Sequence, residues 1–454
     1  MTGRLGAWLC ALALAAASGC VHGAGQGTPL SPREQAQLFL QKGQPERAYP
    51  LLEELHAQNP GDLDAARMLA DAAVRTGRAE ALLAKVDADK RAPQAVRHYL
   101  RGLLFFARSA DAGGPAIREF EQAIALAPDT AEYHYRLGLA LLESEKYAQA
   151  LPPLRRASEL SPKRPGLYLP LAKALARTGD TKGAVAALGK LVAQEPTPAE
   201  VATARALMDQ MADPFAGVPK AAERKLEQGL AWLRDADVPQ QAIVTFEELL
   251  RDYPDLPVVH ALLGLAYQRI DDAGRAVDEF KRAIELAPEV GRTWFYLGEL
   301  YLARQRPEQA REAFEKAVAL NPLLDDAYLR LGDLELERRD VAQARDHFRI
   351  LTALQPESAP ARGKLALALQ LLGDYPAADR ELRKVLDKDP ENVEFMLRLG
   401  LLHAERHLRA SQASEREKAA SEASRWLRKV LEAQPDNALA SRTLDSLKEP
   451  RKGQ

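Results

Sequence analysis

The sequence predicts an all-α fold, a solenoid of stacked helix–turn–helix units. Prolines recur every 34 residues, at Pro254, Pro288, Pro322, Pro356 and Pro390. After each of the first four, the ninth residue is Leu, the tenth is Gly or Ala and the twenty-second is Ala. Hydrophobic residues make up 46% of the chain and charged residues 28%, and the frequent Ala, Leu, Glu and Arg favour helices. A fixed pattern at a fixed period is typical of a repeat architecture.

The first twenty residues differ from the rest of the chain. Arg4 precedes an apolar run, 5–16, that is short for a membrane span, and small residues at 17–19 come just before Cys20. This segment resembles a bacterial lipoprotein signal. The resemblance implies that residues 1–19 are a signal peptide, which is removed, and that Cys20 receives the lipid and becomes the mature N-terminus.

Residues 20–30 are then a lipidated tether, since several acyl chains on one cysteine give stable anchoring. Val21, rather than Asp, follows the cysteine, which in this family indicates an outer-membrane lipoprotein that faces the periplasm. Cys10 lies in the leader, so the mature chain keeps one cysteine and forms no internal disulfide. The alternative is ordinary secretion, with cleavage near Ala17.

The first array of helical units is predicted over residues 31–196. Ser31 is expected to cap the first helix, with Pro32 at its first position. The early units are loose, and Pro128, Pro162 and Pro196 then restore the 34-residue interval.

A joint between two arrays is predicted at residues 197–219. The next closing proline after Pro196 is Pro254, 58 residues on, which is too far for one unit. The excess holds one predicted helix, 198–211, and the turn-rich run 213–219. The alternative is a divergent repeat that has lost its second helix.

The second array is predicted over residues 220–435. Its last unit is stretched by 11 residues near 409–420, either in two longer helices or in a loop. Residues 436–454 are predicted to form a capping helix and a tail, which cover the last apolar face.

One unit shows the repeat pattern almost in full: Trp294, Leu297, Gly298, Tyr301, Ala310, Phe314, Ala317 and Pro322. This pattern resembles the tetratricopeptide repeat. The resemblance covers residues 31–435 except the joint and implies a superhelical solenoid of about eleven helix–turn–helix units. It also implies binding of proteins or peptides, and little more about function.

The sequence contains no pattern that predicts catalysis, a cofactor, a metal or a small-molecule substrate. A nucleophile elbow, a phosphate-binding loop with its Lys and a mature-chain nucleophilic Cys beyond Cys20 are missing from the sequence. His403 and His407 have helical spacing, but Ala404 stands where a zinc protease has Glu, so a solvated helix face is predicted. The net charge of −2 gives no bulk attraction to nucleic acid. We therefore expect a protein that is not an enzyme.

The resemblance places ligand-facing side chains at the second, fifth and ninth positions of each unit. The candidate partner-binding residues there are Tyr135, Leu139, Leu169, Lys173, Arg292, Phe295, Glu299, Leu329 and Asp333. The Asn and basic pair with which some family members grip a C-terminal carboxylate is not found at these positions. An apolar groove suited to a helix or an extended hydrophobic segment is expected. The alternative is that these side chains only pack between neighbouring first helices.

A lipobox followed by tandem repeats is similar to pilotin-type lipoproteins and to repeat lipoproteins of gliding or exopolysaccharide-export complexes. The expected function is a lipid-anchored periplasmic scaffold that assists assembly or stability of an envelope complex for motility, pili, secretion or polysaccharide export. The alternative is a groove-binding regulator of a peptidoglycan-processing or other envelope enzyme. In both cases the partner is a protein.

Overall fold

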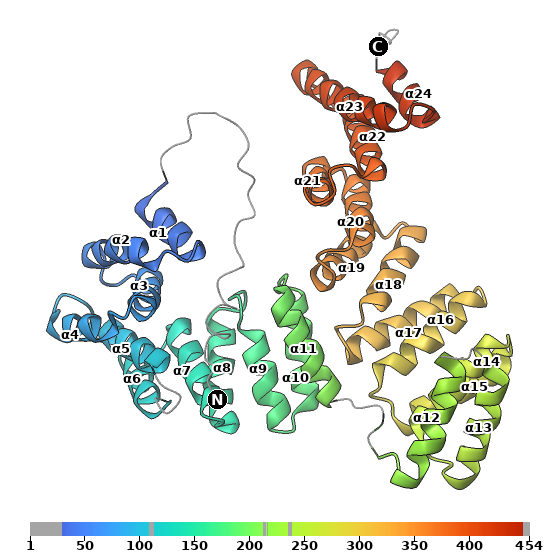
Figure 1. Cartoon of the computed structure of the whole chain (residues 1–454), viewed down its shortest axis with the longest axis horizontal. Coiled ribbons are helices and arrows are strands. Elements are labelled where there is room, and N and C mark those ends of the chain that lie inside the picture. The colour runs from blue at the N-terminus through green and yellow to red at the C-terminus, as the bar shows by residue number, and fades with distance from the viewer. Residues whose placement is uncertain (1–29, 109–112, 212–214, 216, 235–237, 448–454) are drawn as a thin grey trace. The chain divides into compact units, whose positions relative to one another are not determined.

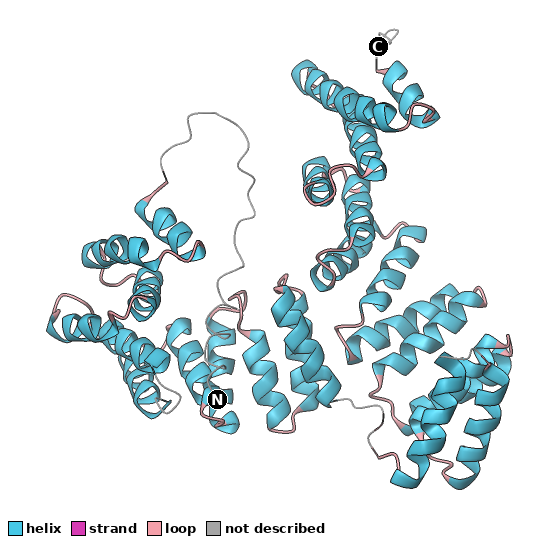
Figure 2. Ribbon diagram, in the orientation of Figure 1, coloured by secondary structure: helices cyan, strands magenta, loops and turns pink. Residues whose placement is uncertain are grey.

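The computed structural model describes residues 30–108, 113–211, 215, 217–234 and 238–447, and its regular elements there are 24 α-helices. Figure 1 labels these helices, and Figure 2 shows helices and loops throughout the described part of the chain. The chain forms two compact units, Met1–Met211 and Ala212–Gln454. No helix within the described residues is both long and apolar enough to cross a membrane.

The first unit consists of five helix pairs and one further helix. Its helices are α1 (Pro32–Gln41), α2 (Pro45–Gln58), α3 (Leu63–Arg75), α4 (Ala79–Ala88), α5 (Gln94–Arg108), α6 (Gly113–Leu126), α7 (Ala131–Glu143), α8 (Tyr147–Leu160), α9 (Tyr168–Arg177), α10 (Thr181–Val192) and α11 (Pro198–Met211). Each pair packs against the next, and α11 contacts α9 and α10. Whether residues 197–219 act as a joint stays a prediction.

The second unit consists of six helix pairs and a final helix. Its helices are α12 (Lys220–Arg234), α13 (Pro239–Asp252), α14 (Pro257–Arg269), α15 (Ala273–Leu286), α16 (Gly291–Ala303), α17 (Pro307–Leu320), α18 (Asp325–Glu337), α19 (Val341–Leu354), α20 (Ala359–Leu371), α21 (Tyr375–Leu386), α22 (Val393–Arg409), α23 (Ala413–Ala433) and α24 (Ala438–Ser446). The extra residues of the last pair lengthen α22 and α23, and α24 packs against both.

A bare glycine on the first helix faces a buried phenylalanine on the second helix in five of the pairs. A Cβ on Gly298 would lie only 2.6 Å from Cε1 of Phe314, whose side chain is fully buried. The same contact joins Gly102 to Phe120, Gly229 to Phe246, Gly264 to Phe280 and Gly332 to Phe348. The small residue of the sequence pattern therefore sets how closely the two backbones approach.

The turn inside each pair contains a residue with positive φ at a fixed place. In the second unit these residues are Asp271, Gln305, Arg339 and Gly373, which are 34 residues apart. The residue after each donates its amide N–H to a carbonyl five residues back, as Arg306 does to Tyr301 at 2.9 Å. This bond closes the first helix and turns the chain into the second.

Candidate functional site

The second unit presents one face built from the first helices of successive pairs. We call it the first-helix face, and it is formed by Phe295, Glu299, Leu329, Arg330, Asp333, Lys364, Leu367, Leu371, Leu397, Arg398 and Leu401. These residues come from α16, α18, α20 and α22 and recur at helical spacing, so each helix turns the same stripe to this face. Most of them are half-buried.

Acidic and basic side chains link neighbouring helices across this face. Glu299 of α16 accepts from both guanidinium nitrogens of Arg330 of α18, with Nε to Oε1 at 2.8 Å and the second contact at 2.9 Å. Asp333 of α18 accepts from Nζ of Lys364 of α20 at 2.6 Å. In each pair the base follows the acid by 31 residues. We call this series the ion-pair ladder.

The structure gives the five predicted site residues of this unit different surroundings. Glu299 and Asp333 belong to the ion-pair ladder, and Arg292 is exposed near the start of α16. Leu329 is half-buried. Phe295 packs against the core of α17 and α18, with its ring 5.6 Å from that of Phe314. Phe295 thus has a packing role whatever else it contacts.

A buried charge network occupies the corresponding positions of the first unit. The carboxylate of Glu132 on α7 binds Nε of Arg136 at 2.7 Å, the guanidinium of Arg164 and the hydroxyl of Tyr99 at 2.8 Å. Burial alone would raise the pKa of Glu132, but the two arginines outweigh it and hold that pKa below its usual value. Burial raises the pKa of Tyr99, whose hydroxyl therefore stays a donor.

One predicted partner-binding residue is wrong on the structure. The side chain of Tyr135 is fully buried, its hydroxyl lies 3.3 Å from the carbonyl of Gly166, and the guanidinium of Arg164 covers its ring at 3.9 Å. The ring fills space beside the network around Glu132, so a partner cannot reach it. The other predicted residues of this unit, Leu139, Leu169 and Lys173, are half-buried.

The prediction of a solvated helix face for the two spaced histidines is also wrong for His403. That side chain is buried, and its Nε2 lies 2.8 Å from Oδ1 of Asp379 on α21. His407 faces the next helix, with Nδ1 3.0 Å from the carbonyl of Arg416. Within the part of the chain that the structure describes, no group of His, Cys, Asp and Glu is arranged to hold a metal.

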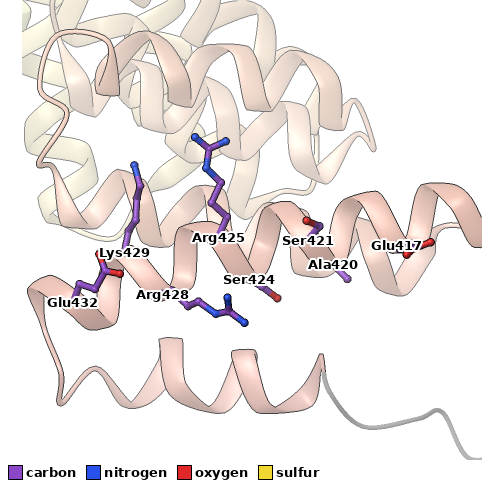
Figure 3. Close-up of a pocket in the computed structure, with 8 residues that line it drawn as sticks. All are labelled: Glu417, Ala420, Ser421, Ser424, Arg425, Arg428, Lys429 and Glu432. Atoms are coloured by element: carbon purple, nitrogen blue, oxygen red, sulfur yellow. The ribbon is translucent and has the colours of Figure 1, made fainter. Parts of the chain in front are cut away.

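A shallow pocket of about 640 Å³ lies along α23. It is lined by Glu417, Ala420, Ser421, Ser424, Arg425, Arg428, Lys429 and Glu432. Figure 3 shows that Arg425 and Lys429 point to one side of the helix while Arg428 points to the other. The cations do not converge, and two carboxylates share the pocket, so the arrangement does not form an anion site.

Sequence models of the tetratricopeptide repeat match most of the chain. One matches residues 39–101 and 141–208, and a second matches 116–165 and a series of overlapping segments from 261 to 438. The chain belongs to the tetratricopeptide repeat family. The predicted all-α solenoid is therefore confirmed, as is its construction from eleven helix pairs.

Several solved tetratricopeptide repeat structures are similar to this chain. "YrrB: a TPR protein with an unusual peptide-binding site" is 20% identical, with 44% of this chain and 97% of that chain covered at a TM-score of 0.38. PilF of Pseudomonas aeruginosa is 18% identical, with 50% and 98% covered at 0.39. MamA of Desulfovibrio magneticus RS-1 is 20% identical, with 39% and 99% covered at 0.34. No functional argument follows from likenesses this distant, and a comparison with curated proteins gave no match.

The tetratricopeptide repeats of this chain share a hydrogen bond that the sequence analysis missed. Six residues after the closing proline, a side chain reaches back to the carbonyl of that proline. The bonds join His134 to Pro128 at 2.7 Å, Tyr168 to Pro162 at 2.8 Å, His260 to Pro254 at 2.9 Å, Trp294 to Pro288 at 3.1 Å and Arg362 to Pro356 at 2.7 Å. Four residue types make one bond, so the shared property is a long side chain with a donor. A search for identical residues misses such a property.

Proposed function

We propose that this tetratricopeptide repeat protein is a non-enzymatic scaffold, anchored by lipid on Cys20 to the outer membrane and facing the periplasm. Its first-helix face binds a protein partner and assists the assembly or stability of an envelope complex. The observation that carries the proposal is the repeat array itself, because helix pairs of this family bind protein partners in the groove that their first helices line.

The anchor is supported by the sequence around Cys20, which lies outside the described residues. Arg4, the short apolar run and the small residues before Cys20 are the features of a lipoprotein signal. Several acyl chains on one residue hold a protein on a membrane without a spanning helix. This mode of attachment fits a chain whose described helices include no membrane span.

Labelling with a radioactive fatty acid tests the anchor. The wild-type chain and the matched control Cys10→Ser are expected to take up label and to sediment with membranes. Cys20→Ser is expected to lose the label and to appear in the soluble fraction. Equal labelling of Cys20→Ser and the wild type would contradict lipid attachment at this residue.

Capture of partners from solubilised envelopes, followed by mass spectrometry, tests the scaffold. A channel or assembly protein of a motility, pilus, secretion or export system should be enriched over a control in which only the lipidated tether is present. Enrichment of a cell-wall synthase or hydrolase would instead favour regulation of an envelope enzyme. If the chain enriches no protein above the tether control, the proposed function is wrong.

A further inference from the structure

The ion-pair ladder stops between α20 and α22. By the spacing of the first two pairs, the residue 31 positions before Arg398 should be acidic, and it is Leu367. Arg398 is in place for the third pair, because its NH1 lies 2.9 Å from where a Cβ on Gly363 of α20 would be. The base therefore lies over α20, and α20 supplies no acid at the equivalent position.

Arg398 is held only by weak contacts in this structure. Its guanidinium binds Glu394, one turn away on the same helix, at 2.7 Å, and lies 5.3 Å from the centre of the Phe395 ring. The side chains of Arg398 and Glu394 are 42% and 65% exposed. Exposed pairs of this type contribute little, about 0.3–0.5 kcal/mol, so a better placed carboxylate can displace Glu394.

Apolar side chains surround the interrupted step. Leu367 is 39% exposed and Leu371, one turn further along α20, is 56% exposed. Leu397 and Leu401 are half-buried at the matching positions of α22. Leu367 and Leu371 share one face of α20 because they are four residues apart. Two neighbouring helices thus offer leucines beside one cation.

The acid at the far end of this surface is already engaged. Glu405 of α22 binds Gln370, accepts from the hydroxyl of Tyr375 at 3.1 Å, and pairs with Arg409 at 2.8 Å. Three partners fix this carboxylate, so it belongs to the packing of α20, α21 and α22. The carboxylate that would complete the ladder beside Arg398 has to come from another molecule.

We propose that Leu367, Leu371, Leu397, Arg398 and Leu401, the α20–α22 surface, bind an acidic amphipathic segment of a protein partner. Apolar side chains of that segment cover the leucines, and one of its carboxylates takes the place of the missing acid beside Arg398. Burial of the leucines provides affinity, and the carboxylate selects acidic over basic segments. This inference rests on the proposed function and names the chemistry of the partner.

The test uses two labelled synthetic peptides of about 14 residues. One is a helix former with Leu at i, i+3, i+4 and i+7 and Glu elsewhere, and the other has Lys in place of every Glu. Fluorescence anisotropy with the purified chain at low salt measures affinity. The acidic peptide is expected to bind at least tenfold more tightly than the basic one, a difference of about 1.4 kcal/mol.

Leu367→Glu is the decisive variant because it supplies the acid that the ladder lacks. The new carboxylate should pair with Arg398 and leave the melting temperature unchanged or higher, while affinity for the acidic peptide falls at least tenfold. Arg398→Gln should remove the preference for the acidic peptide. The matched control Val244→Glu introduces the same charge at a 55% exposed apolar residue of α13 and should bind like the wild type.

Equal binding by Leu367→Glu and the wild type would overturn the inference, as would equal binding of the two peptides or no binding at about 1 mM. A wild-type dimer in sedimentation that Leu367→Glu dissociates would also overturn it, since a second copy would then cover the surface. If Leu367→Glu still captures the envelope partner, the inference fails and the proposed function stands. If the wild type captures none, the proposed function itself fails.

Discussion

At the residue scale, His260 shows how a variable repeat position acquires a specific chemistry. Its Nε2 lies 2.9 Å from the carbonyl of Pro254, and its Nδ1 lies 2.6 Å from a carboxylate oxygen of Glu279. Both neighbours only accept hydrogen bonds, so the ring fits best when both nitrogens carry a proton. Burial opposes this charge, but the bonds to Glu279 and Pro254 outweigh it and raise the pKa of His260.

His260→Gln should therefore destabilise the second unit in a pH-dependent way. A raised folded-state pKa means that the charged ring adds stability below the unfolded pKa of about 6.5, and that this stability is lost as pH rises through the folded pKa. The expected cost is about 1 kcal/mol at pH ~5.5 and close to none at pH ~9. Urea denaturation followed by circular dichroism at the two pH values measures it.

Glu279→Gln is the control for this pair. It removes the acceptor charge and keeps the shape, so it should reproduce the loss at low pH. Adding His260→Gln to it should then cost little more, because the two residues act together. Additive effects of the two substitutions, or a cost that grows toward high pH, would contradict the assignment of charge to His260.

Residue-scale contacts were the part that the sequence predicted least well. The repeat pattern places Tyr135 at a ligand-facing position, yet Arg164 and Gly166 of the following loop bury it. His403 has the spacing of an exposed pair, yet Asp379 of the preceding helix holds it. Both outcomes depend on which side chain a neighbouring unit supplies, and a period within the sequence does not contain that information.

At the element scale, the closeness of the two helices in a pair depends on the bare glycine. Gly298→Ala puts a methyl group 2.6 Å from the fully buried ring of Phe314. Overpacking of this kind costs about 1–3 kcal/mol, which exceeds the gain of up to about 1 kcal/mol from replacing glycine in a helix. The variant should therefore melt below the wild type in a circular dichroism scan.

Gly274→Ala is the matched control. This glycine lies in the first turn of α15, and the nearest atom to a new Cβ is Oδ1 of Asp272 at 3.7 Å. The methyl group has room there, so the variant should melt at or slightly above the wild-type temperature. If Gly298→Ala melts as high as Gly274→Ala, the Gly298 to Phe314 contact does not limit the helix spacing.

The sequence predicted elements well because one physical pattern repeats. Leu, Gly and Ala at fixed places describe a helix pair, and the closing proline begins or ends its helices. The turn was harder to predict, because Asp271, Gln305 and Arg339 adopt the positive φ that Gly373 adopts without strain. No glycine marks those turns, so only the period locates them.

At the scale of the whole molecule, each repeat packs against its sequence neighbours, and the chain forms two compact units. In such an array a local defect destabilises its own unit first. Phe120→Ala removes a fully buried ring from the first unit and should cost about 3–5 kcal/mol there. Calorimetry should show one transition lowered and one unchanged.

Phe314→Ala makes the same change in the second unit and should lower the other transition. A single transition that moves equally in both variants would show that the two units unfold as one. The predicted division at residues 197–219 would then lose its thermodynamic meaning.

The fold was predictable from sequence at this scale, and the partner was not. A repeat period specifies which side of each helix is buried, but the exposed side carries residues chosen for another molecule. The interrupted step at Leu367 and Arg398 became visible only after Glu299, Arg330, Asp333 and Lys364 were seen to pair across helices.

Site-specific photo-crosslinking in the native cell tests most directly whether the first-helix face binds the partner. A photoreactive amino acid replaces Leu329 or Leu401 on this face, or the exposed residues Val244 on α13 and Leu439 on α24 as controls. The account predicts an adduct with one and the same envelope protein from Leu329 and Leu401, and none with that protein from the two controls. Adducts with that protein only from Val244 or Leu439, or none from any position, would contradict it.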